Sequence, residues 1–132
     1  MPSKDQFYVP QKAVIMNGDK YLILKRSTDS VTYPDHWDFP GGKIEHGEEV
    51  EESLIREVKE ETDLDVKVIR PIFAFQKSLN RPNIFIVYLC EKVSGKIELS
   101  HEHTEYKWAT REEILKEEKI EDFLRAFLEN QK

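Results

Sequence analysis

Residues 48–61 carry an unusual density of carboxylates, because seven of these fourteen positions are glutamate. They are Glu48, Glu49, Glu51, Glu52, Glu57, Glu60 and Glu61. Like charges at this spacing repel one another along a helix, so a positive partner is expected nearby. Glu57, Glu60 and Glu61 project from neighbouring turns of the predicted helix, and their hard oxygens suit Mg²⁺ or Mn²⁺. The pattern predicts a divalent metal site, with a solvated acidic surface as the alternative.

The predicted helix also has a face that can pack against a sheet. Val50, Leu54 and Val58 form one apolar stripe at helical spacing. Glu57 and Glu61 fall on the edge of that stripe, where the helix would meet the sheet. The acids are therefore expected at a junction between helix and sheet.

A glycine-rich turn precedes the helix. Gly41 and Gly42 follow a short predicted strand that ends at Pro40, and Gly47 comes just before the helix. Glycine lets the backbone turn sharply and lets a metal or ligand approach its carbonyl oxygens. The order strand, glycine turn, acidic helix favours the metal site over the solvated surface.

The spacing within this stretch is that of a known signature. Gly42 is followed after five residues by Glu48, and after seven more by residues 56–64, REVKEETDL. This pattern resembles the signature of the Nudix hydrolases. One position departs, because the family usually has glycine where this chain has Asp63. That glycine ends the helix in a left-handed conformation, which aspartate tolerates better than most residues. We expect a small stability cost and intact ligands.

The resemblance implies roles for the residues of this stretch. Glu57, Glu60 and Glu61 would supply side-chain ligands to the metal, and the Gly41 carbonyl a further one. Arg56 would orient the glutamates through salt bridges, with an ordinary surface ion pair as the alternative. Glu57 is the expected general base, although the base varies across the family.

A later loop often supplies a final ligand in proteins of this kind. Glu102 precedes a predicted strand and Glu105 begins it, so either could serve. Glu105 is the expected metal ligand, with Glu102 as the alternative. His101 and His103 are expected to be exposed loop residues, because hard metals prefer oxygen.

Basic and aromatic residues near the glycine turn are candidates for substrate binding. Lys43 and Arg26 are expected to contact phosphate, although each fits an ordinary surface charge equally well. Trp37, Tyr33 and Phe75 are candidates for stacking a nucleobase, and Trp37 also fits the core.

Length, charge and cysteine content limit the function further. The 132 residues, 39% of them apolar, indicate one domain spanning residues 1–132. The net charge of −6 argues against stable nucleic-acid binding. Cys90 is the only cysteine, and no apolar run is long enough for a membrane span or a signal peptide. A cytoplasmic protein with no membrane association is expected.

The other elements predict an α/β domain. Apolar runs at 12–16 and 21–25 flank Asn17-Gly18-Asp19, a strong hairpin signal. Strands are also expected at 37–40, 66–75, 84–90 and 105–109, with a polar loop at 27–35 and another at 80–83. Thr110 and Glu113 fit a capping box, and apolar residues from Ile120 to Leu128 recur at helical spacing. The continuously apolar 84–90 run must be covered on both faces. The resemblance implies the same fold, an α/β/α sandwich with a mixed β-sheet between helices.

The expected function is metal-dependent hydrolysis of a phosphoanhydride in a small nucleotide substrate, with Mg²⁺ or Mn²⁺ as cofactor. The segments LILKR and WDFPGGKIE resemble the MutT-like branch, which hydrolyses (deoxy)nucleoside triphosphates to nucleoside monophosphate and pyrophosphate. ADP-ribose and dinucleoside polyphosphates are alternative substrates. A non-hydrolytic nucleotide-binding regulatory domain is an alternative function, but such domains often lose a ligand glutamate and this chain keeps all of them. Folds of this kind often form homodimers, so the oligomeric state stays open.

Overall fold

The first two strands form the hairpin that the sequence predicts. In the computed structural model, which describes residues 6–78 and 82–131, β1 (Pro10–Asn17) pairs with β2 (Lys20–Arg26) across a two-residue turn. Asn17 lies opposite Lys20, and Gly18 in the turn has a φ of 65°. A positive φ at this position is what a tight hairpin turn requires, and glycine adopts it without strain.

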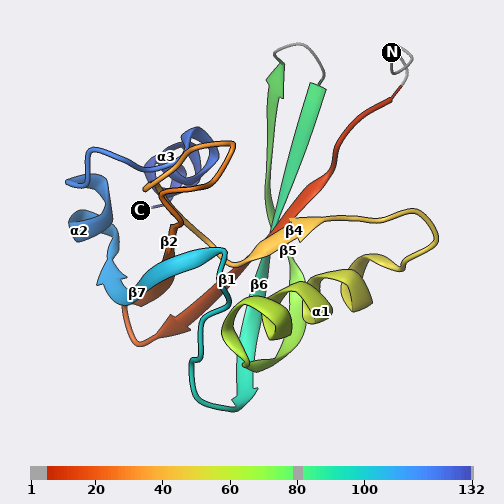
Figure 1. The fold of residues 1–132 in the computed structure, drawn as a ribbon, viewed down its shortest axis with the longest axis horizontal. Helices are drawn as coiled ribbons and strands as arrows, with labels where there is room; N and C mark the ends of the chain where they lie inside the picture. The colour runs from red at the N-terminus through yellow and green to blue at the C-terminus, as the bar shows by residue number, and fades with distance from the viewer. Residues whose placement is uncertain (1–5, 79–81, 132) are drawn as a thin grey trace.

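The described residues form one mixed sheet of seven strands. The remaining strands are β3 (Trp37–Asp38), β4 (Gly41–Lys43), β5 (Asp65–Ser78), β6 (Pro82–Ser94) and β7 (His103–Thr110). The main path runs β3-β2-β1-β6-β5, while β4 pairs with β1 and β7 pairs with β2. β1 and β6 are parallel and the other pairs are antiparallel, which confirms the predicted mixed sheet. β5 and β6 extend as a long hairpin (Figure 1).

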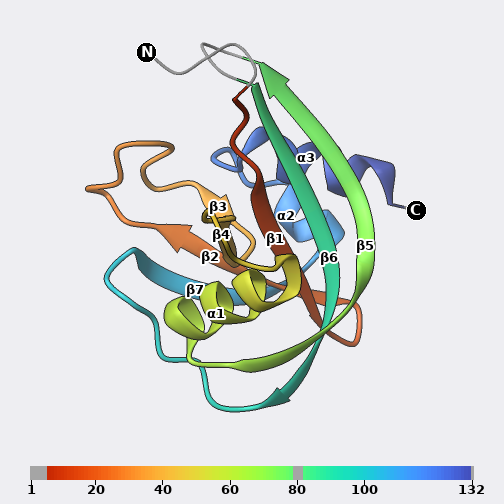
Figure 2. The ribbon, with the colours of Figure 1, turned by 90° about the vertical axis from the view of Figure 1, so that its right-hand side faces the viewer.

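Helices cover both faces of this sheet. Figure 2 shows α1 (Val50–Thr62) on the viewer's side, with α2 (Arg111–Leu115) and α3 (Asp122–Asn130) behind the sheet. The side chains of β6 divide between two cores, because Val87 packs in the cluster that holds α3 while Tyr88 and Cys90 pack in the cluster that holds α1. The prediction that this strand is covered on both faces is confirmed.

The apolar stripe of α1 explains most of its packing. Leu54 and Val58 are fully buried, whereas Val50 is 41% exposed because it begins the helix. The helix ends at Asp63, whose φ is 64°, and the Asp63 amide donates to the Lys59 carbonyl at 2.9 Å. The chain therefore keeps the left-handed helix end that was expected there, with aspartate in place of glycine.

The C-terminal region forms two helices. Thr110 and Glu113 make the predicted capping box at the start of α2. Phe123, Leu124, Phe127 and Leu128 form the buried face of α3. Ile120 lies before that helix and forms a bridge with Trp37. Among the described residues, no helix is long and apolar enough to cross a membrane. Asn80 and Arg81, from the predicted 80–83 loop, lie outside the described residues.

Candidate functional site

The glycine pair creates the space in which the acidic helix meets the sheet. Gly41 has a φ of 145°, and a Cβ there would lie 1.9 Å from the backbone oxygen of Gln11. A Cβ on Gly42 would lie 2.6 Å from the carboxyl carbon of Glu57. Glycine at 41 therefore lets β4 approach β1, and glycine at 42 leaves room for the Glu57 carboxylate.

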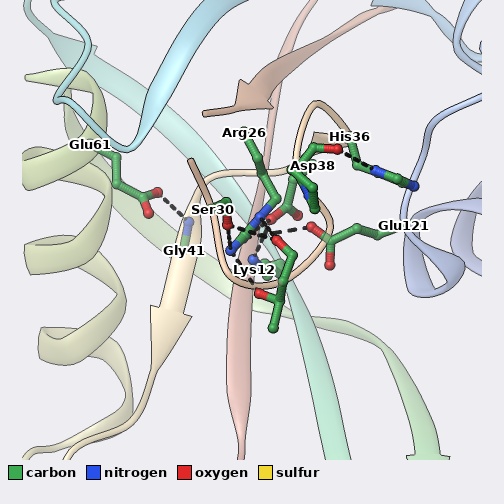
Figure 3. Close-up of polar contacts among 10 residues, drawn as sticks. Lys12, Arg26, Ser30, His36, Asp38, Gly41, Glu61 and Glu121 are labelled. Atoms are coloured by element: carbon green, nitrogen blue, oxygen red, sulfur yellow. Dashed lines mark hydrogen bonds and ion pairs between the residues drawn. The ribbon is translucent and has the colours of Figure 1, made fainter. Parts of the chain in front are cut away.

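Glu61 lies against this turn. Its side chain is almost fully buried, and its Oε1 accepts a hydrogen bond from the Gly41 amide at 2.8 Å (Figure 3). Burial raises the pKa of Glu61 to about 8, and the charges of Asp38 and Glu102 push it in the same direction. Lys12 and the Gly41 amide lower the pKa without reversing the effect of burial. The negative charge of this carboxyl group is therefore only partly compensated when it is ionised.

Glu57 and Glu102 share a cavity with Glu61. This open cavity has a volume of about 1010 Å³, and Gly41 and Gly42 form part of its wall. Burial raises the pKa of Glu57, and the charges of Glu60 and Glu102 add to the effect, although Arg56 opposes it. Glu57, Glu61 and Glu102 thus line one space together with the glycine turn.

Arg56 ties the glutamates of α1 together. Its Nε and Nη2 donate to the two carboxylate oxygens of Glu48 at 2.8 and 2.9 Å, and its Nη1 donates to Glu60 at 2.9 Å. Nη2 also lies 3.2 Å from Glu57 Oε1. These contacts raise the pKa of Arg56, mainly through the hydrogen bonds with Glu48, so one guanidinium offsets the repulsion among three acids.

The structure separates residues that the sequence analysis grouped together. The Glu60 carboxylate is 54% exposed on the Arg56 side, and that of Glu105 is 60% exposed and pairs with Lys25 at 3.3 Å. Neither residue is among the described residues that line the cavity. No three His, Cys, Asp or Glu side chains within 6–78 and 82–131 converge on one metal position. The expected convergence of Glu57, Glu60 and Glu61 is not met by these side-chain positions, and Glu102 rather than Glu105 lies beside the other two.

The donor set nevertheless fits a hard divalent cation. Glu57, Glu61 and Glu102 are all oxygen donors around one cavity, and the pKa values of Glu57 and Glu61 are raised because burial and like charge disfavour their ionised forms. A divalent cation would neutralise this excess negative charge. Mg²⁺ commonly keeps several waters and uses only one or two carboxylates, so a closed cluster of three is not required.

A buried charge network that the sequence analysis missed forms the floor of the cavity. Lys12 Nζ donates to Asp38 Oδ2 at 2.8 Å, and both residues are buried (Figure 3). Arg26 Nη1 lies 3.4 Å from the same oxygen and 3.8 Å from Glu121 Oε2. Burial alone would raise the pKa of Asp38, but Lys12 and the neighbouring hydrogen bonds hold it below its usual value. A lysine inside an apolar strand was the available signal for this network.

Glu121 completes the network as a buried acid with a raised pKa. Burial, followed by the negative charge of Asp38, raises the pKa of Glu121 to about 9. Asp38 Oδ1 and Glu121 Oε2 are both buried, and neither has a donor among the described groups. A proton held by Glu121 and shared with Asp38 would supply that donor.

The predicted substrate-binding residues have different environments. Lys43 lines the cavity, with its Nζ 3.9 Å from the centre of the Tyr8 ring. Arg26 also lines the cavity, but its guanidinium holds the backbone oxygen of Thr32 at 3.0 Å as well as Asp38. Its first role is therefore to shape the loop that follows β2.

Two of the aromatic candidates lie away from the cavity. Trp37 is 7% exposed in the core that holds α3, and Phe75 packs there against Phe85. Neither is among the described residues that line the cavity, so the placement of Trp37 does not support the predicted contact with substrate. Tyr33, the third candidate, does line it.

His103 differs from the expectation of an exposed loop residue. It begins β7 and is buried, and burial lowers its pKa to about 4. Its Nδ1 has no hydrogen-bond partner among the described residues. His103 is therefore a neutral buried side chain, whereas His101 is exposed as predicted.

Comparisons with known proteins agree with this architecture. The family model described as the NUDIX domain matches residues 10–131. The chain is 31% identical to the MutT protein from Methanosarcina mazei Go1 over 99% of this chain and 100% of that one, with a TM-score of 0.87. A MutT NUDIX hydrolase from Burkholderia pseudomallei shares the fold at 22% identity, with a TM-score of 0.86 and coverage of 97% and 100%.

A curated relative gives a further comparison. The chain is 29% identical to the nucleoside triphosphatase NudI of Enterobacter sp. (strain 638), over 76% of this chain and 80% of the relative. Because the family model matches nearly the whole chain, and the acidic helix, glycine turn and mixed sheet are all present, this protein belongs to the Nudix family of pyrophosphohydrolases.

Proposed function

We propose that this protein hydrolyses a phosphoanhydride bond of (deoxy)nucleoside triphosphates, releasing nucleoside monophosphate and pyrophosphate, with Mg²⁺ or Mn²⁺ as cofactor. The observation that carries the proposal is the cavity in which Glu57, Glu61 and Glu102 surround the Gly41–Gly42 turn. The relatives named as nucleoside triphosphatases support this substrate class.

The metal would be held by oxygens of Glu57, Glu61 and Glu102, with the Gly41 carbonyl as a further donor. When bound, such an ion acts as a Lewis acid and lowers the pKa of a coordinated water. In this proposal Glu57 accepts a proton as the general base, its raised pKa makes it a stronger base than an ordinary glutamate, and Arg56 positions its carboxylate. The Gly41 amide holds the Glu61 carboxylate in place.

Basic residues on the cavity wall would receive the phosphates. Lys43 follows the glycine turn and carries its ammonium group over the Tyr8 ring, and both residues line the same cavity. Lysine binds phosphate as a point charge, so it tolerates the change in phosphate position as the bond breaks. Replacement of Lys43 by alanine is expected to raise KM for triphosphates.

A substrate panel tests the proposal. Purified protein is incubated with the (deoxy)nucleoside triphosphates, ADP-ribose and dinucleoside polyphosphates, with Mg²⁺ or with EDTA, and the products are separated and quantified. We expect triphosphates to give monophosphate and pyrophosphate, with no turnover in EDTA. A higher kcat/KM for ADP-ribose or for a dinucleoside polyphosphate would reject the substrate, and undiminished turnover in EDTA would reject the metal. Tight nucleotide binding without cleavage of any compound would favour the regulatory domain.

A further inference from the structure

One of the described residues that line the cavity is a tyrosine in a strained backbone conformation. Tyr33 lies in the loop between β2 and β3, is partly exposed and lines the cavity. Its φ is 46°, in the left-handed region that L side chains rarely adopt. Such conformations persist only when the surrounding structure imposes them, and they are concentrated at ligand sites.

Arg26 imposes this conformation from the base of the loop. Its Nε donates to the Thr32 backbone oxygen at 3.0 Å, and its Nη2 donates to Ser30 Oγ at 2.9 Å and Thr32 Oγ1 at 3.0 Å. Figure 3 shows that Arg26, at the end of β2, reaches both Ser30 in the loop and Asp38 on β3. Because the residue next to Tyr33 is held by two of these bonds, the position of the tyrosine is set before a ligand arrives.

Lys77 and His36 fix the ring itself. Lys77 Nζ lies over the Tyr33 ring, 4.6 Å from its centre, and also pairs with Asp122 at the start of α3. The His36 ring meets the Tyr33 ring edge-on, with centroids 5.2 Å apart. Attraction between a cation and an aromatic face is worth enough to orient a partly exposed ring. Lys77 on β5 and His36 in the same loop therefore contact the Tyr33 ring, while Arg26 on β2 holds the neighbouring Thr32.

The described residues that line this cavity differ in chemistry. Glu57, Glu61 and Glu102 bring carboxylates to it, while Tyr33 and Phe85 bring aromatic rings. Phe85 is stacked on Phe123 with centroids 4.8 Å apart, so one of its faces is already in use. A ligand that fits both kinds of lining carries a polyphosphate, which a metal held by the carboxylates can bind, and a planar ring that can stack on an aromatic side chain.

We infer that Tyr33 is a substrate-binding residue that stacks on the nucleobase of the substrate, with Arg26 and Lys77 as the residues that position it. The inference rests on the proposed function, and it adds the base-binding residue, which the family signature does not include. Stacking accepts every base because every base has an aromatic face, so Tyr33 strengthens nucleotide binding without choosing among bases.

Steady-state kinetics of Tyr33→Phe, Tyr33→Leu and Tyr33→Ala test the inference, with inorganic tripolyphosphate as a competitive inhibitor that lacks a base. We expect Tyr33→Leu and Tyr33→Ala to raise KM for a nucleoside triphosphate about tenfold or more, with kcat within about twofold of wild type. Tyr33→Phe keeps the ring and is expected to keep KM within about twofold. The inhibition constant of tripolyphosphate is expected to stay unchanged in all three. Tyr106→Ala is the matched control, because Tyr106 is an exposed tyrosine on β7 outside the described cavity lining.

Three other outcomes for KM and the tripolyphosphate inhibition constant each overturn the inference. An unchanged KM in Tyr33→Ala means that the ring does not touch the base. An equal rise in KM and in the tripolyphosphate inhibition constant means that the loop supports the phosphate end. A loss in Tyr33→Phe as large as that in Tyr33→Ala assigns the effect to the hydroxyl group.

A wild-type protein that cleaves no nucleoside triphosphate rejects the proposed function rather than the role of Tyr33. In that case calorimetric titration with nucleoside monophosphates decides the inference separately. Weaker binding to Tyr33→Ala than to wild type supports it, and equal or absent binding in both overturns it.

Discussion

The backbone amide of Gly41 donates a hydrogen bond to Glu61 Oε1 at 2.8 Å, and this contact joins the glycine turn to the acidic helix. The bond fixes one oxygen of a nearly buried carboxyl group at the wall of the cavity. It does not compensate for the lost hydration, because the pKa of Glu61 is still raised to about 8. Because Glu61 is buried despite this loss of hydration and lines the same cavity as Glu57 and Glu102, it is the first target for mutation.

Replacement of Glu61 by glutamine is expected to lower kcat by at least about 100-fold while the fold stays intact. Glutamine has the same shape and can still accept from the Gly41 amide, but it has no charge to offer a cation. Thermal unfolding would show an unchanged or higher Tm, because a buried ionisable group has been removed. Glu52→Gln, an exposed change on the same helix, serves as the control. Near-normal turnover of Glu61→Gln with Mg²⁺ would refute the assignment of Glu61 as a ligand.

Local sequence signals predicted the elements well, and contacts distant in sequence escaped them. Asn17-Gly18 marked the hairpin, Thr110 with Glu113 marked the start of α2, and both are set by residues within a few positions. The pairing of Lys12 with Asp38 spans 26 positions and depends on how β3 is added to the sheet. No short-range pattern contains that information.

The candidate site also combines features that local sequence predicts with features that depend on tertiary contacts. The spacing of glutamates on α1 indicated which residues share a helix, but it did not reveal that Arg56 holds Glu60 on the outer side. His103 and Trp37 were also hard to place, because the local sequence around a polar or aromatic residue near a loop does not show whether tertiary packing buries it. Both are buried by elements far away in the chain.

Adding one methyl group is expected to lower kcat at one position of the glycine pair and Tm at the other. At Gly42 the new Cβ would meet the movable end of Glu57, 2.6 Å from its carboxyl carbon, so Gly42→Ala should lower kcat at least about tenfold with little change in Tm. At Gly41 it would meet the backbone of Gln11 at 1.9 Å, so Gly41→Ala should lower Tm by about 10 °C or more. Kinetics and thermal unfolding of both variants check this. A Gly42→Ala enzyme with wild-type kcat would show that the position of Glu57 is unimportant.

Glutamine replacements at the two late acids should separate their roles. Glu102 lines the cavity and raises the pKa values of Glu57 and Glu61, whereas Glu105 pairs with Lys25 on β2. Glu102→Gln is therefore expected to raise the Mg²⁺ concentration for half-maximal activity at least about tenfold. Glu105→Gln should change it less than about twofold, since an exposed ion pair contributes little. Mg²⁺ titrations of both variants decide the matter, and the reverse result would restore Glu105 as the late ligand.

The left-handed helix end at Asp63 predicts an order of stability. With a φ of 64°, Asp63→Gly should raise the free energy of unfolding by about 0.5 kcal/mol, because glycine has no Cβ to strain. Asp63→Ala should lower it by about 1 kcal/mol, since alanine lacks the polar side chain that helps aspartate in this region. Urea denaturation of the three proteins measures the order. If alanine were as stable as aspartate, the family's usual glycine would have no conformational basis at this position.

The shared proton of Glu121 and Asp38 predicts a loss of stability at alkaline pH. The pKa of Glu121 is about 9 in the folded protein, mainly because of burial, and 4.5 is its ordinary value. A raised acid pKa means that the folded state binds the proton more tightly. The stabilisation is therefore complete below pH 4.5 and is lost progressively as the pH rises to about 9.

Glu61, with a pKa of about 8, contributes a similar dependence of stability on pH, so the experiment must isolate Glu121. Glu121→Gln keeps a hydrogen-bond donor for Asp38 and cannot ionise. Urea unfolding from pH 6 to pH 9 should show wild type losing stability relative to Glu121→Gln by up to about 1.4 kcal/mol per pH unit. Parallel curves for the two proteins would mean that Glu121 is ionised in the folded state and that Asp38 finds its donor elsewhere.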